Sequence, residues 1–499
     1  MPSLLFNNPG YPLLSMLLCL PLAGAALAPF VRHQKSLRLF GLVVTVATLC
    51  SSIPLYTEFD RAFAGFQFAE HYSWLSVLGI DYVVGVDGIS AVLVLLTTLL
   101  MPLCMLCSWR EVQERLAEFI VVLLLMEAAL IGVFISLNIV LFYVFWEGML
   151  IPMYLLIAIW GGPRRDYASV KFFVYTFAGS IFLLFALIAL YVATGTCNYP
   201  DLLSYRFNPR MQWLVFVCCA IACAVKTPLY PLHTWLPAAH VEAPTAGSVI
   251  LAGVLLKMGG YGFLRFCIGL APHAAQSAAP LMTAVALVAI LIGGCLALGQ
   301  DDLKRLIAYS SIAHMGFVVL GMFMVSVRGT QAGVLQMVNH GISTSALFIC
   351  VGMLYERTHS RLLADNCALG SSMPRFVTLF TLAACSSFGF PGTNGFIGEF
   401  LVIIAAFEKN IVLGACAVCG VLVAAAYMLR AVQKIIWADR PGNHQHGAAI
   451  HKVLSDINIR EVFVLAVLAG GIVLIGFRPS VVLDMTSASV TMLVQRLSG

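Results

Sequence analysis

Charge is the scarcest property of this chain. Only 10% of its 499 residues are Asp, Glu, Lys or Arg, whereas a soluble domain carries about 25%. Hydrophobic residues make up 61%, and the mean hydropathy is +0.95. This composition argues against a soluble enzyme or a nucleic-acid-binding protein and indicates a polytopic membrane protein.

Signatures of bound cofactors are missing as well. The sequence has no Gly-x-Gly-x-x-Gly after a predicted strand, no Walker loop and no cysteine spacing typical of haem or iron–sulfur clusters. Most of the 15 cysteines lie inside apolar runs, so Cys104 and Cys107 are interpreted as small buried residues rather than as a redox pair. His444, His446 and His451 resemble a metal cluster, but a solvated polar loop explains them better. We predict no metal or cofactor in this chain.

What the sequence does contain is a series of apolar windows long enough to cross a bilayer, which takes about 20 residues. There are 14 of them, so the predicted fold is an all-α polytopic membrane protein with 14 transmembrane helices. No cleavable signal is expected, because the first apolar run lacks a basic leading segment and further spans follow it. The predicted spans are 12–30, 37–56, 88–108, 118–136, 138–160, 170–194, 211–229, 246–268, 279–299, 303–325, 330–354, 374–407, 411–436 and 460–477.

The basic residues predict how these spans are oriented. If both termini lie on the outer side, 18 of the 28 Lys and Arg fall in cytoplasmic loops and seven on the outer side. This excess follows the positive-inside rule. Both termini are therefore expected on the outer side.

Six titratable side chains nevertheless fall inside predicted spans. A charged side chain at bilayer depth costs roughly 2.5–3.5 kcal/mol, so six of them are better explained as a path for an ion than as chance. The six are Glu147, Lys226, Lys257, His314, His340 and Glu399.

Helix-breaking residues accompany two of these charges. Thr-Pro-Leu-Tyr-Pro follows Lys226, and Phe-Pro-Gly-Thr-Asn-Gly at 390–395 precedes Glu399. Paired breaks at corresponding positions point to inverted repeats with ion sites at mid-membrane depth. We expect two inverted five-helix repeats, spans 4–8 and 9–13, with broken helices 7 and 12. The predicted divisions are 1–117 (a three-span region), 118–436 (the ion-translocating core) and 437–499 (a C-terminal span and tail).

Glu147 and Lys226 are candidates for a switchable ion pair. If they approach each other, each stabilises the charged form of the other, and movement of one changes the proton affinity of its partner. The alternative is a static salt bridge that stabilises the bundle. Lys257 has no sequence neighbour to pair with, which suits a proton relay, although a lysine can also extend to the membrane surface.

The histidines have similar alternatives. His314 and His340 are suited to passing protons near neutral pH, but a single buried histidine is often only a hydrogen-bonded core residue. Glu399 is expected to end the path toward the outer side, and His233 beside the Lys226 break is a candidate relay or gate. Glu127 is also intramembrane, and its role is open between a secondary carrier and a helix contact.

The motifs around these residues resemble the antiporter-like membrane subunits of respiratory complex I over nearly the whole chain. The same motifs occur in Mrp-type cation/proton antiporters and membrane-bound hydrogenase subunits. Subunit M, or chain 4, of NADH-quinone oxidoreductase is the family most resembled, because L-type relatives usually have glutamine in place of His314 and lysine in place of Glu399. The motifs are Phe145-Trp146-Glu147 with Met149-Leu150-Ile151-Pro152, KTPLYPLHTWLP at 226–237, Ala243-Pro244-Thr245-Ala246-Gly247, DLKRLIAYSS at 302–311, SSIAHMG at 310–316, and His340-Gly341-Ile342-Ser343 running to His359.

The resemblance implies a proton-translocating subunit of NADH:quinone oxidoreductase, coupled to quinone reduction in other subunits. It implies Glu147 paired with Lys226, Lys257 at the centre and Glu399 as the output site. FMN, iron–sulfur clusters and quinone are then expected in partner subunits, with homologous antiporter-like subunits on either side and lipid around them. The chain length and span count favour a bacterial inner membrane, with both termini periplasmic. The alternatives are a subunit of an Mrp-type antiporter or of a membrane-bound hydrogenase, or a structural scaffold.

Overall fold

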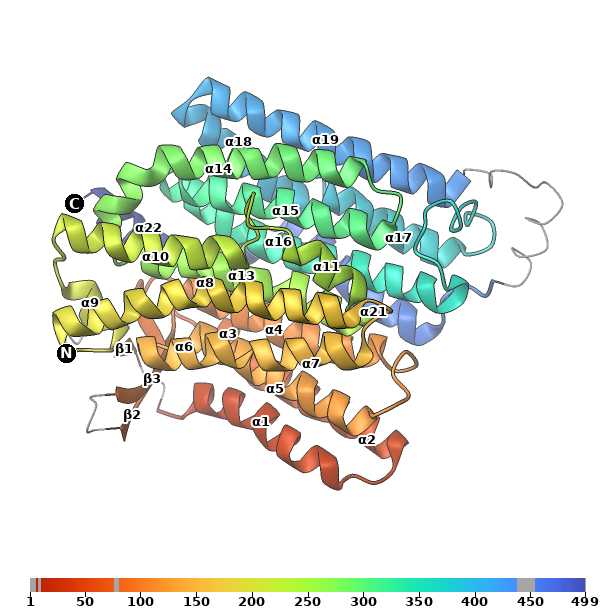
Figure 1. Ribbon diagram of the computed structural model, residues 1–499, viewed down its shortest axis with the longest axis horizontal. Coiled ribbons are helices and arrows are strands. Elements are labelled where there is room, and N and C mark those ends of the chain that lie inside the picture. The colour runs from red at the N-terminus through yellow and green to blue at the C-terminus, as the bar shows by residue number, and fades with distance from the viewer. Residues whose placement is uncertain (1–5, 8–9, 76–79, 438–453, 499) are drawn as a thin grey trace.

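The computed structural model describes residues 6–7, 10–75, 80–437 and 454–498. Long helices run roughly along one axis, and β1 (Phe6–Asn7) lies at the same end of the bundle as α22 (Ser480–Ser498) (Figure 1). Thirteen stretches of the described chain are long and apolar enough to cross a membrane. They are α1 with η1 (Leu13–Leu27, Ala28–Phe30), α2 with α3 (Gln34–Ser52, Pro54–Thr57), α4 (Gly88–Cys107), α5 (Leu116–Ile135), α6 with α7 (Ile139–Gly148, Leu150–Trp160), α8 (Arg165–Thr194), α10 (Pro209–Lys226), the run Thr245–Ile268, α14 (Pro272–Leu298), α15 (Leu303–Met322), α16 (Val327–Thr358), α19 (Ile411–Trp437) and α21 (Ile459–Phe477).

The remaining predicted span, 374–407, is a broken helix, as its Gly and Pro content indicated. It forms α17 (Pro374–Ser387) and α18 (Asn394–Lys409), joined by a non-helical turn in which Gly389 and Gly392 have φ of +73° and +87°. Only glycine adopts this region at little cost. Neither half reaches the length of a full span, so the total of 14 stays a prediction.

The predicted break after Lys226 is also present. α10 ends at Lys226, and the chain is non-helical until α11 (Trp235–Glu242) begins. The Trp235 indole donates a hydrogen bond to the Val225 carbonyl at 2.9 Å, which partly replaces the helical bonding lost at the end of α10. Both breaks thus lie where proline and glycine predicted them; the repeat relation between the two halves stays a prediction.

The all-α prediction is wrong for the segment between the second and third spans. A three-stranded sheet of order β1-β2-β3 is built from β1 (Phe6–Asn7), β2 (Phe66–Leu75) and β3 (Ile80–Val86), with β1 parallel and β3 antiparallel to β2. β-branched and aromatic residues in this stretch favour extended backbone, which a prediction of transmembrane helices alone does not include. The predicted tail also contains a helix, α22 (Ser480–Ser498), and α9 (Tyr199–Ser204) is a further short helix.

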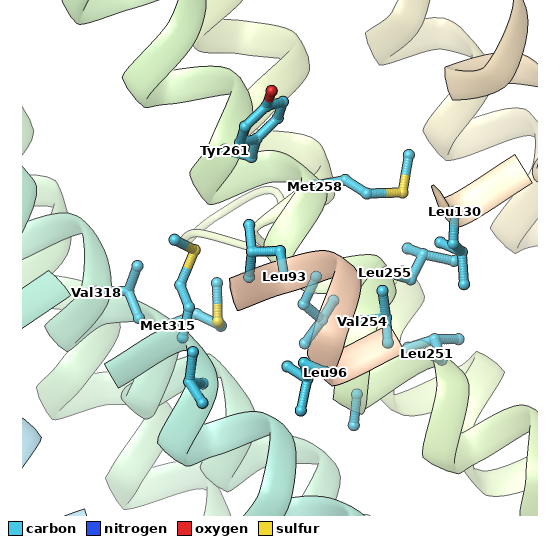
Figure 2. Packing of buried hydrophobic residues seen from close by; sticks show 14 of the residues in the cluster. Leu93, Leu96, Leu130, Leu251, Val254, Leu255, Met258, Tyr261, Met315 and Val318 are labelled. Carbon is cyan, nitrogen blue, oxygen red and sulfur yellow. The ribbon is translucent and has the colours of Figure 1, made fainter. Parts of the chain in front are cut away.

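The span Thr245–Ile268 lies at the centre of the bundle. It is a continuous run of α12 (Thr245–Ile250), η3 (Leu251–Leu255), α13 (Leu256–Gly262) and η4 (Phe263–Ile268), in which η3 and η4 are π-helical turns. Its most apolar window is completely buried inside the protein. Figure 2 shows apolar side chains of α4, α5 and α15 gathered around it, so its polar residues face protein and not lipid.

Arg265 fixes one end of this central span. Its guanidinium pairs with Asp87 at 2.5 Å and lies over the rings of Tyr261, Phe66 and Tyr199. Asp87 also caps α4 by accepting hydrogen bonds from the first backbone amides of that helix. Both partners are buried, so removing one leaves an uncompensated buried charge, which costs roughly 3–5 kcal/mol.

We expect Arg265→Met to lower the thermal stability of the assembled protein markedly, because Asp87 loses its partner. The measurement is the midpoint of thermal unfolding in detergent, with the exposed Arg478→Met as the matched control. An unchanged midpoint for Arg265→Met would contradict a structural role for the ion pair.

Candidate functional site

Lys257 is completely buried in α13 and contacts a histidine from another helix. Its Nζ lies 2.7 Å from His340 Nδ1, and it also donates a hydrogen bond to the Ala252 carbonyl. A charged lysine has no acceptor capacity, so His340 Nδ1 accepts this hydrogen bond when Lys257 holds its proton. Two predicted site residues, 83 positions apart in sequence, are therefore in direct contact.

His314 and Glu399 form the other half of this chain of contacts. The His314 ring centroid lies 5.7 Å from that of His340, and His314 Nδ1 lies 2.9 Å from Glu399 Oε1. Ser387 Oγ lies 3.4 Å from His314 Nε2. Lys257, His340, His314 and Glu399 thus follow one another in space, and only the step between the two imidazoles lacks a direct hydrogen bond.

A small polar cavity adjoins that step. Its volume of about 10 Å³ is close to the minimum that accommodates one water molecule. Nine of its ten lining residues have polar side chains, so a water there has hydrogen-bonding partners and can bridge the two rings. The lining residues are His314, Gln336, Asn339, His340, Ser343, Thr344, Ser386, Ser387, Gly395 and Glu399.

The Gln336 amide contacts the Glu399 carboxylate. Gln336 Nε2 donates to Oε1 at 3.2 Å, beside the contact from His314. Oε2 has no hydrogen-bond partner among the described residues and lies 2.9 Å from the point where a Cβ on Gly389 would sit. Oε1 therefore contacts the buried side chains His314 and Gln336, whereas Oε2 faces the break between α17 and α18.

A second layer of polar groups supports the break itself. Asn339 Nδ2 donates to the Asn394 carbonyl at 2.7 Å, and Ser386 Oγ donates to Asn394 Oδ1 at 2.5 Å. Sequence reasoning missed these residues and Gln336. The available signal was their spacing with His340 and Ser343 on α16, since positions 336, 339, 340 and 343 share one helix face.

Lys226 and Glu147 are neighbours without a direct ion pair. Lys226 is buried at the end of α10, with Nζ 5.0 Å from the Trp146 ring centroid and 3.9 Å from Met149 Sδ. Glu147, at the end of α6, is partly exposed, and its buried Oε1 has no partner among the described residues. Lys226 Nζ does not come within 4.0 Å of either Glu147 carboxylate oxygen. The predicted pair is thus an open arrangement here, with Trp146 and Met149 against the lysine.

One histidine lies on the break that follows Lys226, and a second lies on α11 directly after it. His233 stacks on Tyr230, and its Nδ1 has no partner in the described part of the chain. His240, which sequence reasoning missed, is fully buried on α11, and neither ring nitrogen forms a hydrogen bond with a described residue. Its ring stacks on Phe348, with the two centroids 4.5 Å apart. The only feature of the sequence that could have pointed to His240 is its position. It is an ionisable residue in a stretch without Lys or Arg, between the break after Lys226 and the span that contains Lys257.

A surface cavity of about 270 Å³ adjoins this break. Tyr309, whose ring centroid lies 6.5 Å from that of His233, belongs to its lining. Water in this cavity therefore reaches the immediate neighbourhood of His233. The lining residues are Arg164, Tyr167, Ala168, Lys171, Thr234, Pro237, Ala238, Val241, Glu242, Arg305 and Tyr309.

Glu127 is separate from these contacts. It is fully buried in α5, and neither carboxylate oxygen has a hydrogen-bond partner among the described residues. Its role stays open. Cys104 and Cys107 are buried free cysteines on α4, and His444, His446 and His451 lie outside the described residues.

Comparison with known proteins identifies the family. The family model described as "NADH:quinone oxidoreductase/Mrp antiporter, TM" matches residues 136–424, and the model "NADH-ubiquinone oxidoreductase chain 4, amino terminus" matches 35–133. NADH-quinone oxidoreductase subunit M from Rhodobacter capsulatus is 41% identical over 97% of this chain and 96% of its own length. NADH-ubiquinone oxidoreductase chain 4 from Arabidopsis thaliana is 41% identical over 97% of both chains.

Solved structures agree with these sequence matches. A chain of respiratory complex I from Thermus thermophilus with bound NADH superimposes with a TM-score of 0.86 at 30% identity, over 96% of this chain and 99% of its own. A chain of the Mrp complex from Dietzia sp. reaches a TM-score of 0.82 at 22% identity, over 97% of this chain and 55% of its own, and shares the fold. This chain therefore belongs to the subunit M (chain 4) family of antiporter-like, multi-pass membrane subunits of NADH-quinone oxidoreductase.

Proposed function

We propose that this chain translocates protons as a membrane-arm subunit of an NADH:quinone oxidoreductase. The observation that carries the proposal is the buried succession of Lys257, His340, His314 and Glu399, in which each member lies beside the next. Titratable groups inside a membrane protein mark ion pathways. Relatives of the same family that are 41% identical are subunits of this enzyme, which favours a redox-linked pump over a free-standing antiporter.

In the proposed path, Lys257 passes its proton from Nζ to His340 Nδ1. The proton crosses to His314 through water in the adjoining cavity and then reaches Glu399 Oε1. Release occurs from the free oxygen, Oε2, toward the break between α17 and α18. The transfers from Lys257 to His340 and from His314 to Glu399 need only rotation of a side chain or exchange of a hydrogen bond, because those donor and acceptor atoms are already neighbours.

Lys226 and Glu147 control the loading of this path. When Glu147 moves toward Lys226, it stabilises the charged lysine, and when it moves away, the buried lysine favours release of its proton. His233 and His240 provide nitrogens between the adjacent cavity of about 270 Å³ and the central span. Neighbouring antiporter-like subunits on either side are the proposed source of the movement, since Glu147 is partly exposed on the side of the bundle.

The proposal includes the membrane topology of the chain and the location of the cofactors. The fold has 14 transmembrane helices in two inverted repeats, with a core at 118–436 and both termini on the periplasmic side of a bacterial inner membrane. The chain has no redox site of its own, and FMN, iron–sulfur clusters and quinone are held by partner subunits. Electron transfer in those partner subunits drives proton translocation through this chain.

Glu147→Ala and Lys226→Ala test the loading step. Either substitution is expected to abolish most NADH-driven proton pumping in membrane vesicles, because Lys226 can no longer be switched between charged and neutral forms. Assembly is checked by electron transfer from NADH to an artificial acceptor, and Lys35→Ala, at an exposed position at the start of α2, is the control. Full pumping by an assembled Glu147→Ala or Lys226→Ala complex would refute these roles.

A further inference from the structure

A cavity of about 550 Å³ opens at the end of the bundle near the C-terminus, away from the proton path. It lies between the loop that precedes α10, the start of α14 and the last turn of α22. None of the residues proposed to carry protons lines it. The lining residues are Tyr205, Arg206, Phe207, Gln212, Leu270, Pro272, His273, Gln276, Arg496 and Leu497.

The charge of this lining is positive and uncompensated. It contains Arg206 and Arg496 but no Asp or Glu. Two other surface cavities that contain arginines differ in this respect: one includes Glu242, which pairs with Arg164, and the other includes Glu111, Glu356 and Glu461. Only the cavity at the end of α22 thus offers guanidinium groups without lining carboxylates among these three.

Both arginines have hydrogen-bonding capacity left over. Arg496 is positioned by a hydrogen bond from Nη2 to the Leu203 carbonyl, while its buried Nε has no partner among the described residues. Arg206 is exposed and forms no ion pair with any described residue within 4.0 Å. Arginine groups in this state bind phosphate oxygens through several donors at once.

The cavity also lies at the depth of a membrane surface. Two candidate spans, α10 and α14, begin beside it, and the aromatic side chains of Tyr205 and Trp213 are 49% and 40% exposed there. Tyrosine and tryptophan concentrate at this depth in membrane proteins. Further along the same helices, Val217 on α10 and Leu281 on α14 are exposed apolar residues.

We propose that this cavity binds the phosphate-bearing headgroup of an anionic phospholipid, whose acyl chains lie along the outer faces of α10 and α14. A free phosphate ion fits the two arginines but makes no use of the adjoining apolar faces. A zwitterionic lipid fits the apolar faces but leaves the positive charge of the cavity unbalanced. The phospholipid satisfies both, and it ties α22 to the α10–α14 end of the bundle.

The test uses the intact complex in phosphatidylcholine vesicles that contain phosphatidylglycerol with a photoactivatable group in its acyl chain. Crosslinks are mapped by mass spectrometry and are expected on α10 and α14 near Val217 and Leu281. The double variant Arg206→Gln/Arg496→Gln is expected to reduce these crosslinks about 25-fold, since each arginine near anionic lipid contributes about fivefold. Arg478→Gln, which removes an arginine outside the cavity, is the matched control and leaves the crosslinks unchanged.

His273→Glu is the second variant, because it adds a negative charge to the lining at an exposed position, where the side chain is not part of the packed core. It is expected to reduce the same crosslinks severalfold. The proposal is overturned by equal labelling from photoactivatable phosphatidylcholine, or by displacement with millimolar inorganic phosphate, which indicates a site for the free ion. Absence of labelling in the unmodified complex also overturns it and indicates that a neighbouring subunit fills the cavity.

Discussion

Lys257→Met is expected to reduce NADH-driven proton pumping to background while the complex still assembles. Methionine is an unbranched side chain of similar length, so it fills the completely buried site without the cost of an uncompensated charge. What it removes is the donor 2.7 Å from His340 Nδ1. No other described lysine contacts His340, so the protons of the central span have no route to the histidine.

The control for this prediction is Lys409→Met. Lys409 is an exposed lysine at the end of α18, where it donates to the Phe323 carbonyl at 3.2 Å, outside the buried chain. Proton pumping is followed by quenching of a pH-sensitive dye in membrane vesicles, and assembly by NADH oxidation with an artificial acceptor. If Lys257→Met retains coupled pumping equal to that of Lys409→Met, the central relay is wrong.

Lys257 and Glu399 could be singled out from the sequence for a physical reason. A lysine or glutamate in an apolar span carries an insertion penalty large enough to require an explanation, so Lys257 and Glu399 were conspicuous. Gln336 and Asn339 are neutral, and their smaller cost did not distinguish them from ordinary polar residues of a helix. Yet Gln336 makes a direct contact with Glu399.

Contacts between distant parts of the chain were the other limit. Asp87 and Arg265 are separated by 178 positions, and no local pattern announces that they meet. The same holds for the open arrangement of Glu147 and Lys226, because the sequence places both in spans but does not fix the rotation of either helix. Breaks were easier to predict, since proline and glycine act on the backbone locally.

Gly389→Ala is expected to cause the second large loss of pumping, through the geometry of Glu399. An added methyl group at position 389 would lie 2.9 Å from Glu399 Oε2, closer than ordinary contact, so the carboxylate must move. Oε2 is the oxygen without a partner, and the proposed release occurs from it. A displacement of about 1 Å at a reacting group can cost about 100-fold in rate.

The difficulty with this variant is that Gly389 also has φ of +73°, where alanine is strained by roughly 1–2 kcal/mol. Gly392→Ala separates the two effects. It lies in the same break with φ of +87°, but an added Cβ there meets only the Phe477 ring at 3.7 Å. Backbone strain is thus similar in the two variants, while only Gly389→Ala crowds the carboxylate.

The expected result is loss of pumping in Gly389→Ala and near-normal pumping in Gly392→Ala, at equal levels of assembled complex. Gly389→Ala combined with Glu399→Asp, whose shorter side chain withdraws from position 389, is expected to recover part of the activity relative to Gly389→Ala alone. Equal loss in the two glycine variants would mean that the shape of the break matters and the free oxygen of Glu399 does not. The proposed proton release from Oε2 would then be wrong. Because Oε1 is already engaged by His314 and Gln336, the proton would have to leave from an atom outside this carboxylate.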